Sequence, residues 1–181
     1  CSKWMNQWPV LFLSFKDVDG NCFENAYEML KFSLSQACIT HTYLQQDPKI
    51  DDTFQKKFSA LKDQTASLQE VKTSILILMQ MMRDHYGKPV ILLIDEYDVP
   101  IAKASAKGYY PEMLEVIKGL MSTALKDNDA LRFAVITGCL HIAKESIFTG
   151  TNNFVSDTIT SSRLNEYFGF TQAEVDQLLQ D

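Results

Sequence analysis

The sequence predicts an α/β fold of three layers, in which a mostly parallel β-sheet is flanked by helices. Three short apolar runs, at residues 10–15, 90–94 and 131–136, have the length of strands and alternate with long segments of helical spacing. A run that is apolar on both faces, such as residues 90–94, is typical of the interior of a parallel sheet with helices on each side. At 181 residues, the chain is long enough for one domain with a sizeable core.

The first expected strand, residues 10–15, ends in a turn rich in aspartate and glycine at residues 17–20. Asn21 is the expected N-cap of a long amphipathic helix, with Glu24 as its capping-box partner. Apolar residues recur at helical spacing as far as Gln46, where we expect this helix to end.

A shorter helix is expected within residues 49–64, where the apolar face is weak. Ser67 and Glu70 form a second capping-box pattern, which predicts the start of another strong helix. We expect this helix to end at Gly87, since glycine readily adopts the left-handed backbone that follows many helices. The chain then enters the strand at residues 90–94.

After the second strand, residues 102–108 are polar or small and predict a loop. Pro111 suits the first turn of a following helix, which leads to the third strand at residues 131–136. Beyond it, we expect a short helix at residues 141–148 and a fourth, shorter strand at residues 154–160.

A last helix is expected near the C-terminus, because Thr171 and Glu174 form a third capping-box pattern. The predicted organisation is an α/β domain at residues 1–165 and the start of a C-terminal helical segment at residues 166–181.

Composition excludes several classes of protein. A net charge of −6 argues against broad electrostatic binding of nucleic acid, which needs clustered lysine and arginine. No apolar run approaches the roughly 18 residues that a membrane span needs, and no signal peptide is visible. The four cysteines lack the spacing of a zinc site. We therefore expect a cytoplasmic protein without a membrane partner or a direct nucleic-acid signature.

The chemistry-bearing pair is Asp95 and Glu96, which directly follow the most apolar strand. In open α/β sheets, ligands bind at the carboxyl ends of the strands. The first carboxylate of such a pair can hold Mg²⁺, and the second can orient or deprotonate an attacking water. The pattern is that of a Walker B element, although a solvated loop or a carboxylate at a helix N-terminus would look the same.

Four stretches carry a resemblance to a known family. The chain resembles the bacterial AAA-ATPase-like family, predicted P-loop ATPases that often precede a PD-(D/E)xK nuclease-like domain. Residues 20–87 match only weakly, and the third and fourth stretches are the most specific. The stretches are PVLFLSFKDV at residues 9–18, VILLIDEYDVP at 90–100, FAVITGCLHIAKESIFTGTNNF at 133–154 and EYFGFTQAEV at 166–175.

The resemblance implies a fold like that of P-loop NTPases, with ATP and Mg²⁺ as cofactors. It assigns Asp95 to Mg²⁺, Glu96 to activation of water, and Thr137 to a position that senses the γ-phosphate. Asp98 completes the DEYD string and would hold a loop or a second partner at the nucleotide, and Arg163 is the one late arginine able to approach it. A nuclease-like domain in the same parent chain, a protein partner or self-association is also implied.

One departure from the family is serious. A P-loop ATPase needs GxxxxGK[ST], whose amides wrap the phosphates, and this string is absent from the sequence. The nearest string, Gly87-Lys88-Pro89, precedes a strand instead of following one. Because the first residue is Cys1 and not methionine, we expect the phosphate loop and its strand to lie upstream, in a longer protein.

These residues are accordingly expected to form the Walker B and sensor half of an ATPase domain that lacks its first strand. Without that strand, strand edges stay unpaired and apolar surface stays uncovered. We expect the strands at residues 10–15, 90–94 and 131–136 to remain together, the region at residues 154–160 to be displaced, and the chain alone to bind nucleotide poorly and be inactive.

Two other functions are open at this point. The chain can be a degenerate, non-hydrolysing nucleotide-binding or protein-interaction module, in which Asp95 and Glu96 only end a strand. The sequence upstream of residue 1 would discriminate between this module and the enzyme. A phosphotransfer domain of the receiver type, using Asp95, would need acidic residues near Asp17 and a lysine near Thr137, and Lys144 fits this poorly.

Overall fold

The computed structural model describes residues 5–139, 155–158, 161 and 169–179. The chain divides into two compact units, Cys1–Gly150 and Thr151–Asp181, and each is described by itself. The domain boundary expected after residue 165 falls inside the second unit and stays a prediction.

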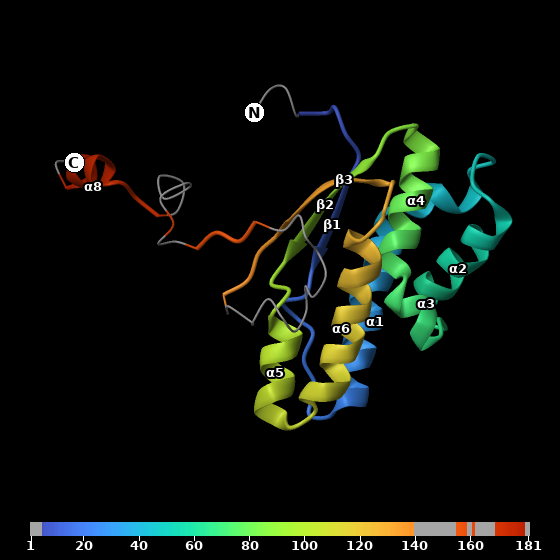
Figure 1. Cartoon of the computed structure of the whole chain (residues 1–181), viewed down its shortest axis with the longest axis horizontal. Helices are drawn as coiled ribbons and strands as arrows, with labels where there is room; N and C mark the ends of the chain where they lie inside the picture. The colour runs from blue at the N-terminus through green and yellow to red at the C-terminus, as the bar shows by residue number, and fades with distance from the viewer. Residues whose placement is uncertain (1–4, 140–154, 159–160, 162–168, 180–181) are drawn as a thin grey trace. The chain divides into compact units, whose positions relative to one another are not determined.

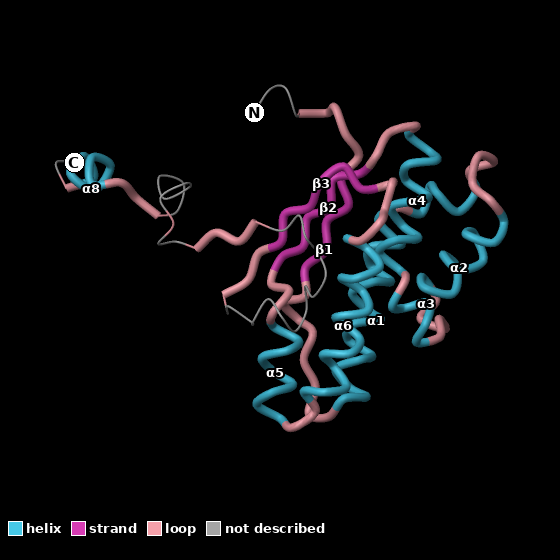
Figure 2. Tube along the Cα trace, viewed as in Figure 1, coloured by secondary structure: helices cyan, strands magenta, loops and turns pink. Residues whose placement is uncertain are grey.

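The first unit is built on a parallel sheet of three strands in the order β1-β2-β3 (Figure 2). The strands are β1 (Val10–Ser14), β2 (Val90–Asp95) and β3 (Leu131–Ile136), so the three predicted strands and their parallel pairing are confirmed. Because all three run in the same direction, their carboxyl ends meet at one edge of the sheet.

Three helices contact the sheet and lie along one of its faces (Figure 1): α1 (Phe23–Thr40), α4 (Ser74–Tyr86) and α6 (Tyr110–Leu125). Alternate strand residues point toward this helical layer and are buried, Leu11 and Leu92 completely. Pro111 lies in the first turn of α6, as predicted.

The opposite face of the sheet carries exposed apolar side chains. Phe12 is 57 % exposed and Val135 47 %, and both lie on the face that the three helices leave open. The expectation of uncovered apolar surface therefore agrees with the structure. A second helical layer and a missing strand, which would explain that surface, both stay predictions.

The start of α1 differs from the expected Asn21 cap. Cys22 is the N-cap, and its side chain makes no capping bond. A Cβ on Gly20 would lie 2.3 Å from Ala26 N, so the preceding loop packs directly on the first helical turn. This close approach, together with a hydrogen bond from Tyr109 Oη to Gly20 O (2.9 Å), fixes the entry of the helix instead of the asparagine side chain.

The expected end of this helix at Gln46 is also wrong in detail, because α1 stops at Thr40 and a 3₁₀ turn, η1 (Thr42–Gln46), follows. His41 N donates to both Ala37 O and Cys38 O, a shared bond that tightens the last turn. The short helix expected within residues 49–64 is confirmed as α2 (Asp52–Lys62).

The helix expected from Ser67 to Gly87 is two helices, α3 (Leu68–Lys72) and α4. The predicted capping box and the left-handed Gly87 are confirmed. The break lies at Thr73, whose hydroxyl donates back to Gln69 O (3.0 Å). Thr123 Oγ1 of α6 donates a hydrogen bond to Lys72 O (2.7 Å) beside this break.

The loop expected at residues 102–108 is wrong, because α5 (Val99–Lys107) occupies this stretch. Pro100 lies in its first turn, where a missing N–H does no harm, and Gly108 ends it in a left-handed conformation (φ 86°). Alanine is the best helix former, so the small residues that suggested a loop favour the helix instead.

In the second unit, α8 (Gln172–Leu178) begins with the predicted Thr171–Glu174 capping box. Residues 155–158 form no strand, because no described strand pairs with them, and the rest of the expected fourth strand lies outside the described residues. The helix expected at residues 141–148 lies outside them as well.

Within the described ranges, the structure contains no helix with both the length and the apolar character to cross a membrane.

A buried carboxylate, Asp47, ties η1 to the C-terminal end of α4. It accepts hydrogen bonds from Lys49 N (2.8 Å) and from the ring of His85. The Lys49 N–H and then His85 hold the pKa of Asp47 below its ordinary value. Tyr86 Oη donates to Tyr43 Oη (3.0 Å) beside them, so the helix end and the 3₁₀ turn are joined by one polar cluster.

Replacing Asp47 with Asn should lower the midpoint of urea unfolding at neutral pH, because the variant loses the negative partner of His85. A carboxylate whose pKa is lowered in the folded state stabilises the fold at any pH above its unfolded pKa of about 4. This contribution to the free energy of unfolding is lost as the pH falls further. The difference between wild type and variant should therefore narrow below that pH, as followed by circular dichroism. Asp52→Asn, an exposed change in the first turn of α2, is the control and should lower stability by less than about 1 kcal/mol, the range for a charge at a helix N-terminus. If the difference in urea midpoint between wild type and Asp47→Asn stayed the same in acid, it would contradict this role for Asp47.

Candidate functional site

The acidic pair lies at the carboxyl edge of the sheet, where a polar side chain from the next strand meets it. Asp95 is the last residue of β2, and Thr137 directly follows β3. Thr137 Oγ1 donates a hydrogen bond of 2.7 Å to Asp95 Oδ1. The structure therefore brings together two residues that are 42 positions apart and that the sequence assigned to one site.

Backbone hydrogen bonds extend the pairing of β2 and β3 past the strand ends. Thr137 N donates to Ile94 O (2.8 Å), and Tyr97 N donates to Thr137 O (3.1 Å). These bonds hold the peptide groups on both sides of the acidic pair, so the Asp95–Thr137 contact is supported by the backbone as well as by the side chains.

Glu96 has a left-handed backbone, with φ of 53°. A residue other than glycine in this region is held there at a cost of about 1–3 kcal/mol and is frequent at functional sites. Val99 N donates to Glu96 O (3.2 Å), which closes a tight turn between β2 and α5. Glu96 itself is half-buried in this turn.

Asp98 is placed differently from the other acidic residues, because it is only 2 % exposed. It is the N-cap residue of α5, and Ala102 N donates to its carbonyl (2.8 Å). A Cβ on Gly138 would lie 2.5 Å from Asp98 Oδ1 and 2.8 Å from a ring carbon of Tyr97. The segment after β3 thus packs directly on the start of α5, and any larger residue at position 138 would force the Asp98 or Tyr97 side chain to shift.

Ser14 is a member of this edge that the sequence analysis did not identify. It pairs in register with Asp95, and Phe15 N donates to Asp95 O (3.0 Å). Its hydroxyl oxygen is buried and has no hydrogen-bond partner within the described residues. Its position in the sequence could have identified it, because Ser14 is the last residue of its strand, as Asp95 is of the next.

The loop after β1 is tied to the end of α5 at the same side of the sheet. Lys107 Nζ and Asp19 Oδ1 are 2.7 Å apart, and the hydrogen bond from Lys107 is the main reason that the pKa of Asp19 is lowered. Both groups are partly exposed, so this ion pair positions the loop more than it stabilises the fold.

The arrangement offers oxygen ligands of the kind that Mg²⁺ prefers. One oxygen of Asp95 accepts from Thr137, and the other makes no hydrogen bond within the described residues. Among those residues, no group of three or more His, Cys, Asp or Glu side chains is arranged to hold a metal. A magnesium ion at Asp95 would therefore take most of its ligands from water and from phosphates, as is usual for this ion.

Two residues considered from the sequence are not placed. Arg163, assigned to the nucleotide by resemblance, lies outside the described residues, and so does Lys144. The edge is therefore defined by Ser14 and Asp95 at the ends of the first two strands, by Glu96 directly after β2 and by Thr137 directly after β3.

Comparison with known proteins gives a family for most of the chain. The profile of the family AAA-ATPase_like, described as "Predicted AAA-ATPase", matches residues 1–148. A protein of Azotobacter chroococcum mcd 1, "Uncharacterized protein in vnfD 5'region", is 37% identical over 94 residues. That match covers 50% of this chain and 17% of the relative, so the chain spans only a small part of that protein's length. No solved structure matches significantly.

Gly138→Ala should destabilise the first unit by roughly 1–3 kcal/mol, because the added methyl overlaps Asp98 and Tyr97 in a packed turn. Urea unfolding followed by tryptophan fluorescence measures the change. Cys139→Ala, at the next and exposed position, is the matched control and should stay within about 0.5 kcal/mol of wild type. Equal stabilities for the two variants would contradict the close packing of this segment on α5.

Proposed function

The chain belongs to the family of predicted AAA-ATPases, and we propose that it supplies the Walker B and sensor half of a Mg²⁺–ATP site. The observation that carries the proposal is the 2.7 Å hydrogen bond between Thr137 Oγ1 and Asp95 Oδ1 at the carboxyl edge of the sheet. A strand-end carboxylate oriented by a neighbouring hydroxyl suits a cation that is itself bound to phosphates.

Each residue has a distinct role in this proposal. Asp95 holds Mg²⁺, directly or through water, with the oxygen that Thr137 leaves free. Thr137 keeps that carboxylate in position and lies where a γ-phosphate would be sensed. Glu96, the next residue, whose backbone is left-handed, takes the proton of the attacking water.

Asp98 has a structural role in this proposal. Because it is buried at the start of α5 and lies against Gly138, we assign it to holding the loops of the site in place. Arg163 remains a candidate for the nucleotide on the resemblance alone.

The residues present fit only part of a nucleotide site. Asp95, Glu96 and Thr137 match the metal and water side, and bound Mg²⁺–ATP would supply the phosphoryl group and the positive charge beside it. The 181 residues contain no GxxxxGK[ST] string to cradle the phosphates. We therefore expect these 181 residues alone to bind nucleotide weakly and to hydrolyse it poorly.

A specific observation also supports the second candidate, a non-hydrolysing interaction module. Phe12, Phe133 and Val135 are exposed on the open face of the sheet, and an apolar sheet face is a usual place for another protein segment to pack. In that case Asp95 and Glu96 end a strand and carry no chemistry.

Glu96→Gln in the complete gene product should leave Mg²⁺–ATP binding intact and lower the turnover rate by about 10²–10⁴-fold, the range for loss of a general base. Binding is measured by calorimetry, and turnover by release of phosphate. Glu112→Gln, an exposed change on α6, is the control and should leave both unchanged.

The outcomes separate the two candidate functions. Binding without turnover in the variant supports Glu96 as the base. A wild-type protein that binds no ATP would leave the acidic pair as a structural feature and favour the interaction module. Full turnover by Glu96→Gln would contradict the role given to Glu96.

A further inference from the structure

The outer edge of β1 presents a row of backbone groups that no described strand uses. β1 pairs only with β2 in the sheet. Ile91 N donates to Pro9 O (2.9 Å), and Phe15 N donates to Asp95 O (3.0 Å). The odd-numbered residues of β1 and its flanks therefore direct their backbone groups toward β2. In a parallel pair the intervening residues point the other way, and the N–H and C=O groups of Val10, Phe12 and Ser14 therefore face outward.

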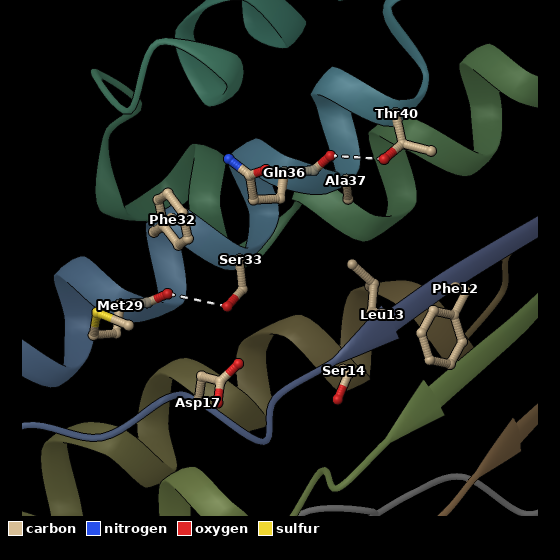
Figure 3. A pocket seen from close by; sticks show the side chains of 10 residues that line it. All are labelled: Phe12, Leu13, Ser14, Asp17, Met29, Phe32, Ser33, Gln36, Ala37 and Thr40. Atoms are coloured by element: carbon tan, nitrogen blue, oxygen red, sulfur yellow. Dashed lines mark hydrogen bonds between the residues drawn. The ribbon is translucent and has the colours of Figure 1, made fainter.

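A groove of about 380 Å³ lies along this edge, between β1 and α1 (Figure 3). Phe12 and Asp17 line one side of it, and Met29, Phe32 and Gln36 line the other. The α1 residues recur at helical spacing, so they form one stripe that follows the strand. The groove thus combines open backbone groups on one wall with a mixed apolar and polar helix face on the other.

The groove exposes aromatic surface and has a closed floor. Phe12 is 57 % and Phe32 46 % exposed, whereas Leu13 and Ala37 between them are buried. The Ser14 hydroxyl lines the same groove and has no hydrogen-bond partner within the described residues. Buried polar groups of this kind are usually satisfied, so the edge is a site that still lacks a partner group.

The backbone pattern determines which kind of ligand fits. Outward groups recur at every second residue of β1, and another extended chain is the structure whose N–H and C=O groups repeat at the same interval. A helix packing on this edge would leave those groups unpaired. The ligand is therefore an extended peptide that adds a strand to the sheet.

The negative charge of Asp17 indicates which charge the ligand should carry. Asp17 is the one charged residue that lines the groove, and within the described residues it makes no ion pair. A second copy of this chain is a poor occupant, because each copy carries a net charge of −6. A basic residue near the Asp17 end of the groove complements it instead.

We propose that the groove between β1 and α1 binds an extended segment of a partner protein as an added β-strand, with apolar side chains against Phe12 and Phe32 and a basic residue facing Asp17. This inference does not depend on nucleotide binding, since the groove involves neither Glu96 nor Thr137.

The test uses a fluorescein-labelled synthetic peptide of alternating valine and threonine with a lysine at each end. Binding to the chain is followed by fluorescence anisotropy. The same peptide N-methylated at every valine and threonine should bind at least tenfold more weakly, because it cannot donate along either edge of the strand. Equal affinity for the two peptides would overturn strand addition.

Two variants locate the site. Phe12→Pro removes an outward N–H that β2 does not use, so the sheet is retained, as proline is tolerated on edge strands. It should bind the lysine-ended peptide several-fold more weakly than Phe12→Thr, which also lacks the ring but keeps the N–H. Equal binding by the two variants would place the peptide elsewhere.

Asp17→Lys tests the charge without touching the strand. It should reverse the preference between the lysine-ended peptide and a glutamate-ended one, by roughly three- to fivefold for an exposed pair. Asp52→Lys, an exposed change of the same charge on α2, should leave the preference as in wild type. An unchanged preference in Asp17→Lys, or a dimer in sedimentation that the peptide does not dissociate, would overturn the proposal.

Discussion

The parallel pairing of β2 with its two neighbours is the constraint on which the rest of this structure depends. Ser14, Asp95 and Thr137 reach one edge only because three strands run in the same direction and in this register. A shift of one residue would turn every side chain of β2 to the other face and separate Asp95 from Thr137. The apolar residues buried against the helices hold that register. The same strand register therefore builds the core and aligns the residues of the candidate site.

The helices cover one face of the sheet, and the surfaces assigned to function lie at its margins. The acidic pair is at the carboxyl edge of β2, and the peptide groove runs along the outer edge of β1. Ser14 belongs to both, since it pairs with Asp95 and lines the groove. A strand bound at β1 would thus lie one strand away from the proposed metal ligand, Asp95, which would give a partner protein a short physical route to the proposed nucleotide site.

Local patterns predicted the strands, the Ser67 and Thr171 capping boxes and Gly87, because each depends on a few adjacent residues. The sequence could also place Asp95 and Thr137 at one edge, since parallel strands end together. The break at Thr73 was not predicted, because the capping-box and apolar patterns run across it and the contact beside it, from Thr123 to Lys72 O, comes from a helix distant in the sequence. The left-handed backbone of Glu96 likewise depends on its turn and has no signal in the residue type.

The hydrogen bond between Thr137 and Asp95 is the central claim, and a double-mutant cycle tests it most directly. Mg²⁺–ATP affinity is measured for the complete gene product and for Asp95→Asn, Thr137→Val and the double variant. If Thr137 orients the carboxylate that holds Mg²⁺, the two losses are not additive, and the coupling is about 1 kcal/mol or more. Additive losses would mean that the two residues act independently and would contradict the account.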